Sequence, residues 1–149
     1  MSSELIVRPL QPTDRAQWAP LWNGYLTFYK SALPAEITDL TFARFFDALE
    51  PMHALVAEQD GKLIGLVHYM LHRSTWAKHN YCYLEDLFVD SNIRGKGVGR
   101  ALIAAVTDAA RAAGSSRVYW ITHETNTTAQ TLYNKVAERP GFIQYRIKF

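Results

Sequence analysis

Three glycines at alternate positions could form an anion-binding site. Gly95, Gly97 and Gly99 lie between a strand-like apolar run and the start of a helix-like one. Glycine permits backbone angles at which several N–H groups point into one concavity, and the first turn of a helix carries unpaired N–H groups and a partial positive charge. Arg94 and Lys96 add two cations. The turn therefore predicts a phosphate site, although the glycines could instead serve only to shape a tight turn.

Two common phosphate-binding motifs do not fit this spacing. A P-loop needs a serine or threonine after its lysine, whereas Lys96 is followed by Gly97. The dinucleotide fingerprint needs its last glycine three residues after the second, whereas Gly99 follows Gly97 by two. ATP and NAD are therefore disfavoured as ligands.

The spacing that does fit is R-x-x-G-x-G, formed by Arg94, Gly97 and Gly99. With this motif the chain resembles the GNAT superfamily of acetyl-CoA-dependent N-acetyltransferases. Residues 126–133 resemble the N-x-x-A-x-x-L-Y helix of the family, and residues 84–87, Leu-Glu-Asp-Leu, are similar to its spermidine/spermine acetyltransferase branch. The residues around the second motif also resemble a branch that includes fungal histone and D-amino-acid acetyltransferases.

The resemblance implies acetyl-CoA as the co-substrate and indicates which residues hold it. In the family, backbone N–H groups of the glycine motif bind the CoA pyrophosphate, and the preceding strand hydrogen-bonds the pantetheine arm. The residues placed at acetyl-CoA in this way are Leu87, Phe88, Val89, Arg94, Gly95, Lys96, Gly97, Val98, Gly99, Arg100 and Asn126. Asn126 could instead cap its helix. The reaction requires no metal.

Amide formation needs a base for the acceptor ammonium and a proton donor for the leaving thiolate. Glu85 matches the position of the base in the polyamine branch, and we expect burial on a helix-covered strand to raise its pKa. Alternation along the strand should point Asp86 to the opposite face. The resemblance places Tyr133 beside the CoA sulfur, and a phenol with a pKa of about 10 can donate there at neutral pH. Ion pairing of the acids and core packing of the tyrosine are the alternatives.

Two aromatic residues of the first helical region are candidates for the acceptor site. The rings of Tyr25 and Tyr29 suit the alkyl part of an amine, although aromatic residues at helical spacing usually pack in a core. With Glu85 and Asp86 they form the predicted acceptor site. The predicted function is acetyl transfer to a primary amine, which could belong to a polyamine, an amino acid or a lysine side chain. The alternative is a non-catalytic acyl-CoA-binding regulatory or interaction module.

Hydrophobic periodicity predicts the elements that must position these residues. Strands are predicted at residues 5–8, 53–59, 62–72, 81–89, 117–122 and 142–149, and helices at about 13–29, 38–49, 98–113 and 128–137. The dipeptide Asp60-Gly61 predicts a tight hairpin. A hairpin followed by alternating strands and helices predicts an α/β fold with a mixed, mostly antiparallel sheet and helices on both faces, which is the acyl-CoA N-acyltransferase fold of the resemblance.

Composition narrows the possible partners. The 149 residues are 48% hydrophobic and 20% charged, as expected for one globular domain over residues 1–149. No apolar run approaches the roughly 20 residues that span a bilayer, so no membrane partner is expected. The net charge of +2 is spread thinly, which disfavours nucleic acid. The lone cysteine, Cys82, and the lack of a leader pattern predict the cytoplasm.

The C-terminal part departs from the family pattern in two ways. Gly141-Phe142 follows Tyr133 by eight residues rather than four, and the chain ends one strand into the hairpin expected there. We therefore expect an unpaired sheet edge along residues 143–149 and a homodimer that covers it. Folding of these residues over their own domain is the alternative.

Overall fold

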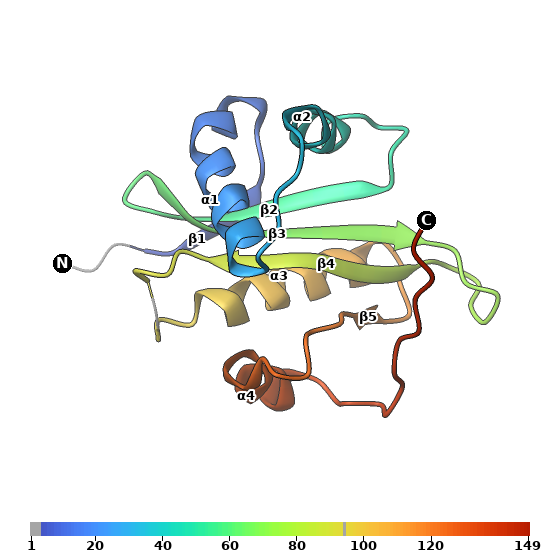
Figure 1. The fold of residues 1–149 in the computed structure, drawn as a ribbon. Helices are drawn as coiled ribbons and strands as arrows, with labels where there is room; N and C mark the ends of the chain where they lie inside the picture. Colours follow the sequence, from blue (N-terminus) through green and yellow to red (C-terminus); the bar gives the residue numbers. More distant parts are fainter. Residues whose placement is uncertain (1–3, 94) are drawn as a thin grey trace.

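The computed structural model describes residues 4–93 and 95–149 (Figure 1). Arg94, predicted to begin the glycine motif, lies outside the described residues. After the first strand, a short 3-10 turn, Pro12–Asp14, leads into the first helix. The strands are β1 (Ile6–Pro9), β2 (Met52–Gln59), β3 (Lys62–His72), β4 (Tyr81–Val89) and β5 (Val118–Tyr119). The helices are α1 (Arg15–Phe28), α2 (Ala35–Arg44), α3 (Val98–Ala112) and α4 (Thr127–Val136).

The five strands form one sheet in the order β1-β2-β3-β4-β5. The first four are antiparallel neighbours, and β5 joins β4 in parallel. Helices α1 and α2 cover one face, and α3 and α4 lie on the other (Figure 1). This confirms the predicted fold class. Among the described residues, no helix is both long and apolar enough to cross a membrane.

The β2–β3 hairpin has the predicted turn. Asp60 and Gly61 both have positive φ, 55° and 74°, which a two-residue hairpin requires because those angles match the twist of the strands. The hairpin fixes the register between β2 and β3. On its other side β3 pairs with β4, and there His68 lies opposite Asp86. This pairing places His68, a polar residue of β3, beside the predicted acceptor site at Asp86.

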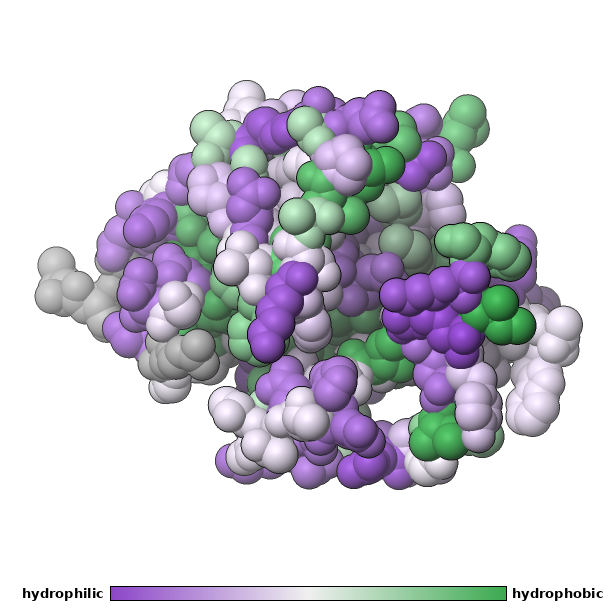
Figure 2. Space-filling view, in the orientation of Figure 1, coloured by the Kyte–Doolittle hydropathy of each residue, from purple (hydrophilic) through white to green (hydrophobic). Residues whose placement is uncertain are grey.

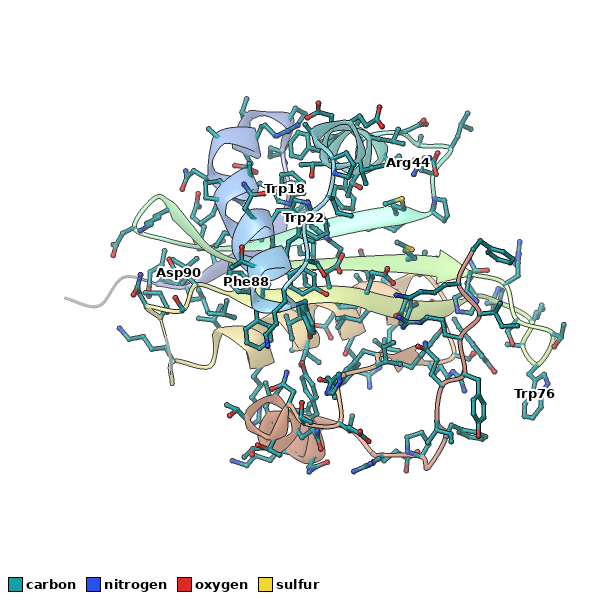
Figure 3. The ribbon with its side chains drawn as sticks, in the orientation of Figure 1. Trp18, Trp22, Arg44, Trp76, Phe88 and Asp90 are labelled. Atoms are coloured by element: carbon teal, nitrogen blue, oxygen red, sulfur yellow. The ribbon has the colours of Figure 1, made fainter. Side chains whose placement is uncertain are left out.

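Each face of the sheet has its own hydrophobic core. Under α3, Leu102 and Val106 pack against apolar side chains of β3 and β4. Under α1 and α2, Trp18, Trp22 and Phe42 pack against the other face, and both tryptophans point from α1 toward the sheet (Figure 3). Residues of the central strands are therefore buried from both sides, except where a helix ends.

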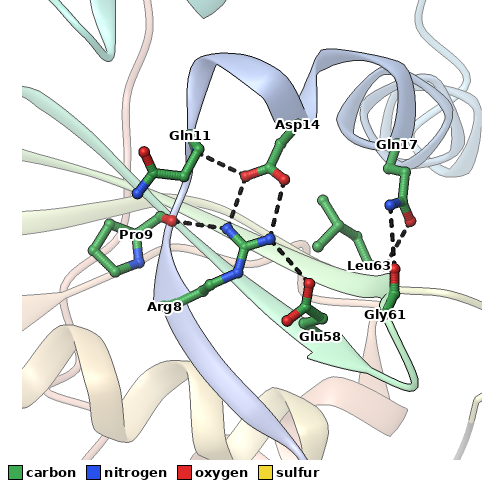
Figure 4. A network of polar contacts seen from close by, with 8 residues as sticks. All are labelled: Arg8, Pro9, Gln11, Asp14, Gln17, Glu58, Gly61 and Leu63. Carbon is green, nitrogen blue, oxygen red and sulfur yellow. Dashed lines mark hydrogen bonds and ion pairs between the residues drawn. The ribbon is translucent and has the colours of Figure 1, made fainter.

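An arginine clamp joins the start of α1 to the sheet (Figure 4). The Arg8 guanidinium donates to both Asp14 oxygens, at 2.8 and 3.0 Å, and to Glu58 at 3.1 Å. The backbone N–H of Gln11 also donates to Asp14. Hydrogen bonding to Arg8 is the largest cause of a lowered pKa at Asp14, so this buried carboxylate is held ionised. The clamp fixes where α1 begins relative to β1 and β2.

The predicted closing strand over residues 142–149 is wrong, because these residues form an irregular segment. Their alternation of apolar and polar side chains is strand-like, but a strand needs a neighbour with a free edge, and β5 is only two residues long. The strand predicted at 117–122 is correspondingly too long. Figure 2 shows an opening between α4 and the C-terminal segment, and Phe142 and Tyr145 are exposed.

The second helix also differs from its prediction. It begins at Ala35 rather than at residue 38, since the Pro34 carbonyl accepts from the N–H groups of Ile37 and Thr38. The Thr38 hydroxyl accepts from the Trp22 indole instead of capping a helix. The helix ends at Arg44, before the predicted residue 49.

Candidate active site

The glycine turn after β4 has the backbone that an anion site needs. Gly95 and Gly97 have φ of 71° and 74°, values that side-chain-bearing residues rarely adopt. A Cβ atom added at either position meets nothing within 4 Å, so the space beside the turn is open. These two glycines are therefore required by backbone geometry and not by crowding within the protein.

The turn leads directly into the first turn of α3. Gly97 is the N-cap and has no side chain to satisfy the helix N–H groups, and its carbonyl accepts the N–H of Ala101 at 3.0 Å. The N–H groups of Val98, Gly99 and Arg100 come before that bond and cannot be paired within the helix. The side chain of Val98 is buried, so only its backbone can face a ligand.

Strands β4 and β5 separate beside this helix start. Their parallel pairing covers only Cys82 with Val118 and Tyr83 with Tyr119. From Asp86 to Val89 the β4 backbone pairs with β3 on one side and has no β5 residue opposite it on the other. This leaves an open strand edge over residues 87–89, where the sequence predicted backbone hydrogen bonds to a ligand.

Helix α4 lies beside the start of α3, near the open edge of β4. A Cβ atom built on Gly99 would meet Leu132 of α4 at 3.5 Å and Val89 of β4 at 4.0 Å. Asn126 caps α4, because its side-chain oxygen accepts the Ala129 N–H at 3.3 Å. Tyr133 is half-buried with its ring 5.4 Å from that of Trp120. Burial raises the pKa of its hydroxyl, which therefore stays protonated at neutral pH.

Glu85 lies at an irregularity in β4. The register pairs Tyr69 with Leu84 and His68 with Asp86, so Glu85 has no residue opposite it. Its side chain is exposed, contrary to the expected burial, yet neighbouring atoms remove part of its hydration. This loss of hydration, and then the charge of Asp86, raise the pKa of the carboxyl group above its ordinary value, whereas a hydrogen bond with Tyr83 lowers it. The simple alternation predicted for the two acids is interrupted here.

Asp86 is held more firmly than Glu85. Its Oδ2 lies 2.9 Å from Nδ1 of His68, and its charge contributes to the raised pKa of Tyr25, after burial as the larger cause. Tyr29 packs on Tyr25 with ring centroids 5.0 Å apart. Burial, and then the charge of Asp86, raise the pKa of Tyr29, which in turn contributes to the raised pKa of Tyr133. The structure thus brings the aromatic residues at the end of α1 beside the two acids of β4.

Comparison with known proteins agrees with this geometry. Residues 18–137 match the Acetyltransferase (GNAT) family. The chain belongs to the GNAT family of acetyltransferases. The D-amino-acid N-acetyltransferase HPA3 of Saccharomyces cerevisiae is 36% identical to this acetyltransferase over 148 residues, which are 98% of this chain and 92% of the yeast protein.

Two further relatives are more distant. The mouse thialysine N-epsilon-acetyltransferase is 30% identical over 109 residues, 64% of each protein. The structure of the aminoglycoside N-acetyltransferase AAC(6')-Iy in complex with CoA has a TM-score of 0.85 and 20% identity, and the match covers 99% of this chain and 97% of that one. The structural likeness confirms the fold, and the family confirms the predicted enzyme class, an N-acetyltransferase.

The acetyltransferase structure brings together most of the residues that the sequence indicated. Tyr25 and Tyr29 lie beside Asp86 and Glu85, because, after burial, the charges of these acids contribute to the raised pKa values of the tyrosines. The side chains of Lys96 and Arg100 are exposed at the glycine turn. The contacts of all these residues with acetyl-CoA or an acceptor stay predictions.

Sequence reasoning missed two residues beside this site, His68 and Trp18. His68 is a lone polar residue in the apolar interior of a strand, and this feature could have indicated a functional role. Its importance depends on the β3–β4 register, which puts it opposite Asp86. Periodicity along one strand cannot supply a cross-strand register.

A surface hollow of about 420 Å³ lies at the other end of β4 from the glycine turn. Trp76 projects from the loop that forms it (Figure 3). Its lining residues are Trp76, Ala77, Lys78, His79, Tyr81, Gly114, Ser116 and Arg117, with no carboxylate among them. The predicted base and acid, Glu85 and Tyr133, are not among the residues that line this hollow.

Proposed function

We propose that this acetyltransferase transfers the acetyl group of acetyl-CoA to the primary amine of a small acceptor. The observation that carries the proposal is the position of Glu85 and Asp86, where β4 parts from β5 and shortly before the glycine turn. Unpaired N–H groups at the start of α3 fit the pyrophosphate of the donor substrate, and the open edge of residues 87–89 fits its pantetheine arm. Lys96 and Arg100 would add positive charge, as would Arg94.

The proposed chemistry is direct attack of the amine on the thioester. Glu85 takes a proton from the acceptor ammonium, and the nitrogen lone pair then forms a bond to the acetyl carbonyl carbon. The carbon–sulfur bond breaks, and the thiolate takes a proton from the hydroxyl of Tyr133. The nitrogen loses its second proton as the amide forms, and solvent returns that proton to the Tyr133 phenolate, while Glu85 releases the first proton to solvent. The raised pKa of Glu85 strengthens it as a base, and Tyr133 is protonated at neutral pH before the reaction. Asp86, Tyr25 and Tyr29 bind the acceptor.

We propose an amino acid or a related compact amine as the acceptor, with a polyamine or a lysine side chain as the alternatives. Support comes from the D-amino-acid acetyltransferase that matches nearly the whole chain, and from the thialysine enzymes that match part of it. Two carboxylates beside aromatic rings suit an ammonium group attached to a short apolar stem.

An acceptor panel tests this function directly. Release of the CoA thiol is measured with acetyl-CoA and, in separate reactions, D-amino acids, thialysine, lysine and polyamines, and mass spectrometry identifies the acetylated product. We expect thiol release that depends on the acceptor and is strongest for an amino-acid amine. If acetyl-CoA binds and no acceptor supports turnover, the non-catalytic acyl-CoA-binding module replaces the enzyme proposal.

We also propose a homodimer in which the C-terminal segment, residues 142–149, is covered by a second copy. Phe142 and Tyr145 are 91% and 90% exposed, and further apolar residues of this segment are visible on the surface at the right of Figure 2. Covering them would remove apolar area from water. Light scattering should give twice the 17.0 kDa of one chain, and deletion of residues 146–149 should halve that mass. A single-chain mass for the intact protein at micromolar concentration would contradict the dimer.

A further inference from the structure

His68 is a buried titratable residue for which the chemistry above has no use. It lies on β3 and is 1% exposed, yet both ring nitrogens have partners. Nδ1 is 2.9 Å from Asp86 Oδ2, and Nε2 is 3.1 Å from the indole nitrogen of Trp18. The ring also packs against Phe45, with centroids 4.5 Å apart. Its surroundings are therefore apolar apart from these two hydrogen bonds.

The partner on one side determines which nitrogen carries the proton. An indole N–H can only donate a hydrogen bond, so Nε2 of His68 must accept from Trp18. The ring proton then lies on Nδ1, from which it is donated to Asp86. Trp18 is itself fully buried, so no water competes for the indole. The two hydrogen bonds therefore run in one direction: Trp18 donates to His68, and His68 donates to Asp86.

Of these three hydrogen-bonded residues, Asp86 is the one that reaches the proposed acceptor site. Its side chain is 13% exposed, and a carboxylate so placed is costly unless donors surround it. His68 donates to one oxygen of Asp86 at 2.9 Å. After loss of hydration, the largest cause, the charge of Asp86 contributes to the raised pKa values of Tyr25, Tyr29 and Glu85, so these three side chains lie near the carboxylate. The hydrogen bond from His68 restricts the rotation of the carboxyl group and leaves its remaining lone pairs for a ligand.

We propose that His68 is a positioning residue for the acceptor, and this rests on the proposed acetyl transfer to an amine. Held by the Trp18 indole in one tautomer, His68 orients Asp86 so that the carboxylate binds the acceptor ammonium. His68 does not touch the acceptor, and it has no part in binding acetyl-CoA. Loss of the Nδ1 donor should therefore weaken acceptor binding and spare donor binding.

Two substitutions of His68 by amide residues distinguish the loss of the Nδ1 hydrogen-bond donor from the loss of the imidazole ring. His68→Asn places an amide nitrogen near the position of Nδ1 and can still donate to Asp86, whereas His68→Gln places its amide near Nε2 and can pair only with Trp18. Both variants lose the same ring packing. We expect the acceptor KM to rise about 10-fold in His68→Gln, as for loss of a hydrogen bond to a charged group, and much less in His68→Asn. The KM for acetyl-CoA should stay unchanged in both.

Equal acceptor KM values in the two variants, or an acetyl-CoA KM that rises with that of the acceptor, would overturn the positioning role. If either variant fails to fold, ¹⁵N NMR of the wild-type imidazole decides. A protonated Nδ1 with an unprotonated Nε2 supports the role, and the opposite tautomer contradicts it. Failure of the wild-type protein to acetylate any amine is a separate result, because it removes the proposed function itself.

Discussion

Gly99→Glu is expected to lower the affinity for acetyl-CoA about 100-fold while leaving the protein folded, a loss of about 2.7 kcal/mol. A side chain at this position points into the gap between Val89 and Leu132, beside the unpaired N–H groups of α3. A carboxylate there repels an anionic ligand. It also lies in the first turn of a helix, where negative charge is stabilising, so the fold should not suffer. Calorimetric titration with acetyl-CoA measures the effect.

Gly99→Ala is the matched control. Gly99 has an ordinary helical backbone, and the contacts an added Cβ would make are at normal van der Waals distances. Alanine also favours the helix, so affinity and stability should stay close to those of the wild-type protein. If Gly99→Glu binds acetyl-CoA as tightly as Gly99→Ala, the ligand does not lie at the start of α3.

Glu85→Gln is expected to lower kcat/KM about 100-fold at pH 7 without weakening acetyl-CoA binding. The carboxylate accepts the proton of the acceptor ammonium, and glutamine cannot. Wild-type activity should fall as the pH drops through the raised pKa of Glu85, because the protonated group is no longer a base. At alkaline pH the acceptor amine is already free. The ratio of wild-type to variant activity should therefore be largest near neutral pH and smaller on either side.

A glutamate-to-glutamine substitution elsewhere in the chain provides a control for Glu85→Gln. Glu138→Gln removes a carboxylate from the exposed segment after α4, and its pH–rate profile should match that of the wild-type protein. An undiminished rate for Glu85→Gln at pH 7 would transfer the role of base to another group, and Asp86 would be the next to replace.

Local patterns were sufficient to predict much of the fold. The bounds of β4, the Asp60-Gly61 turn and the start of α3 at Val98 all follow from residues close together in the sequence. The positive φ of Gly95 and Gly97 likewise follows from the residue type that such a turn demands. The candidate anion site could be predicted for the same reason, since a helix start and its glycines are neighbours along the chain.

What the sequence could not predict depends on pairing between distant segments. The irregularity at Glu85 arises where β3 and β4 change register, and the role of His68 needs that same register. Residues 142–149 have a strand pattern and no strand partner, so periodicity alone misassigned them. Exposure of Glu85 likewise depends on where the covering helices end rather than on its own strand.

The two halves of the site differ in how they are anchored. Glu85 and Asp86 belong to a central strand with a core on each face, whereas α4, which carries Tyr133, contains no fully buried residue. Local unfolding of α4 therefore costs less free energy than opening the sheet. A ligand that fills the gap between α3, β4 and α4 is linked to that local equilibrium. We therefore expect part of its binding energy to order α4, so that Tyr133, the proposed proton donor, becomes fixed when acetyl-CoA binds.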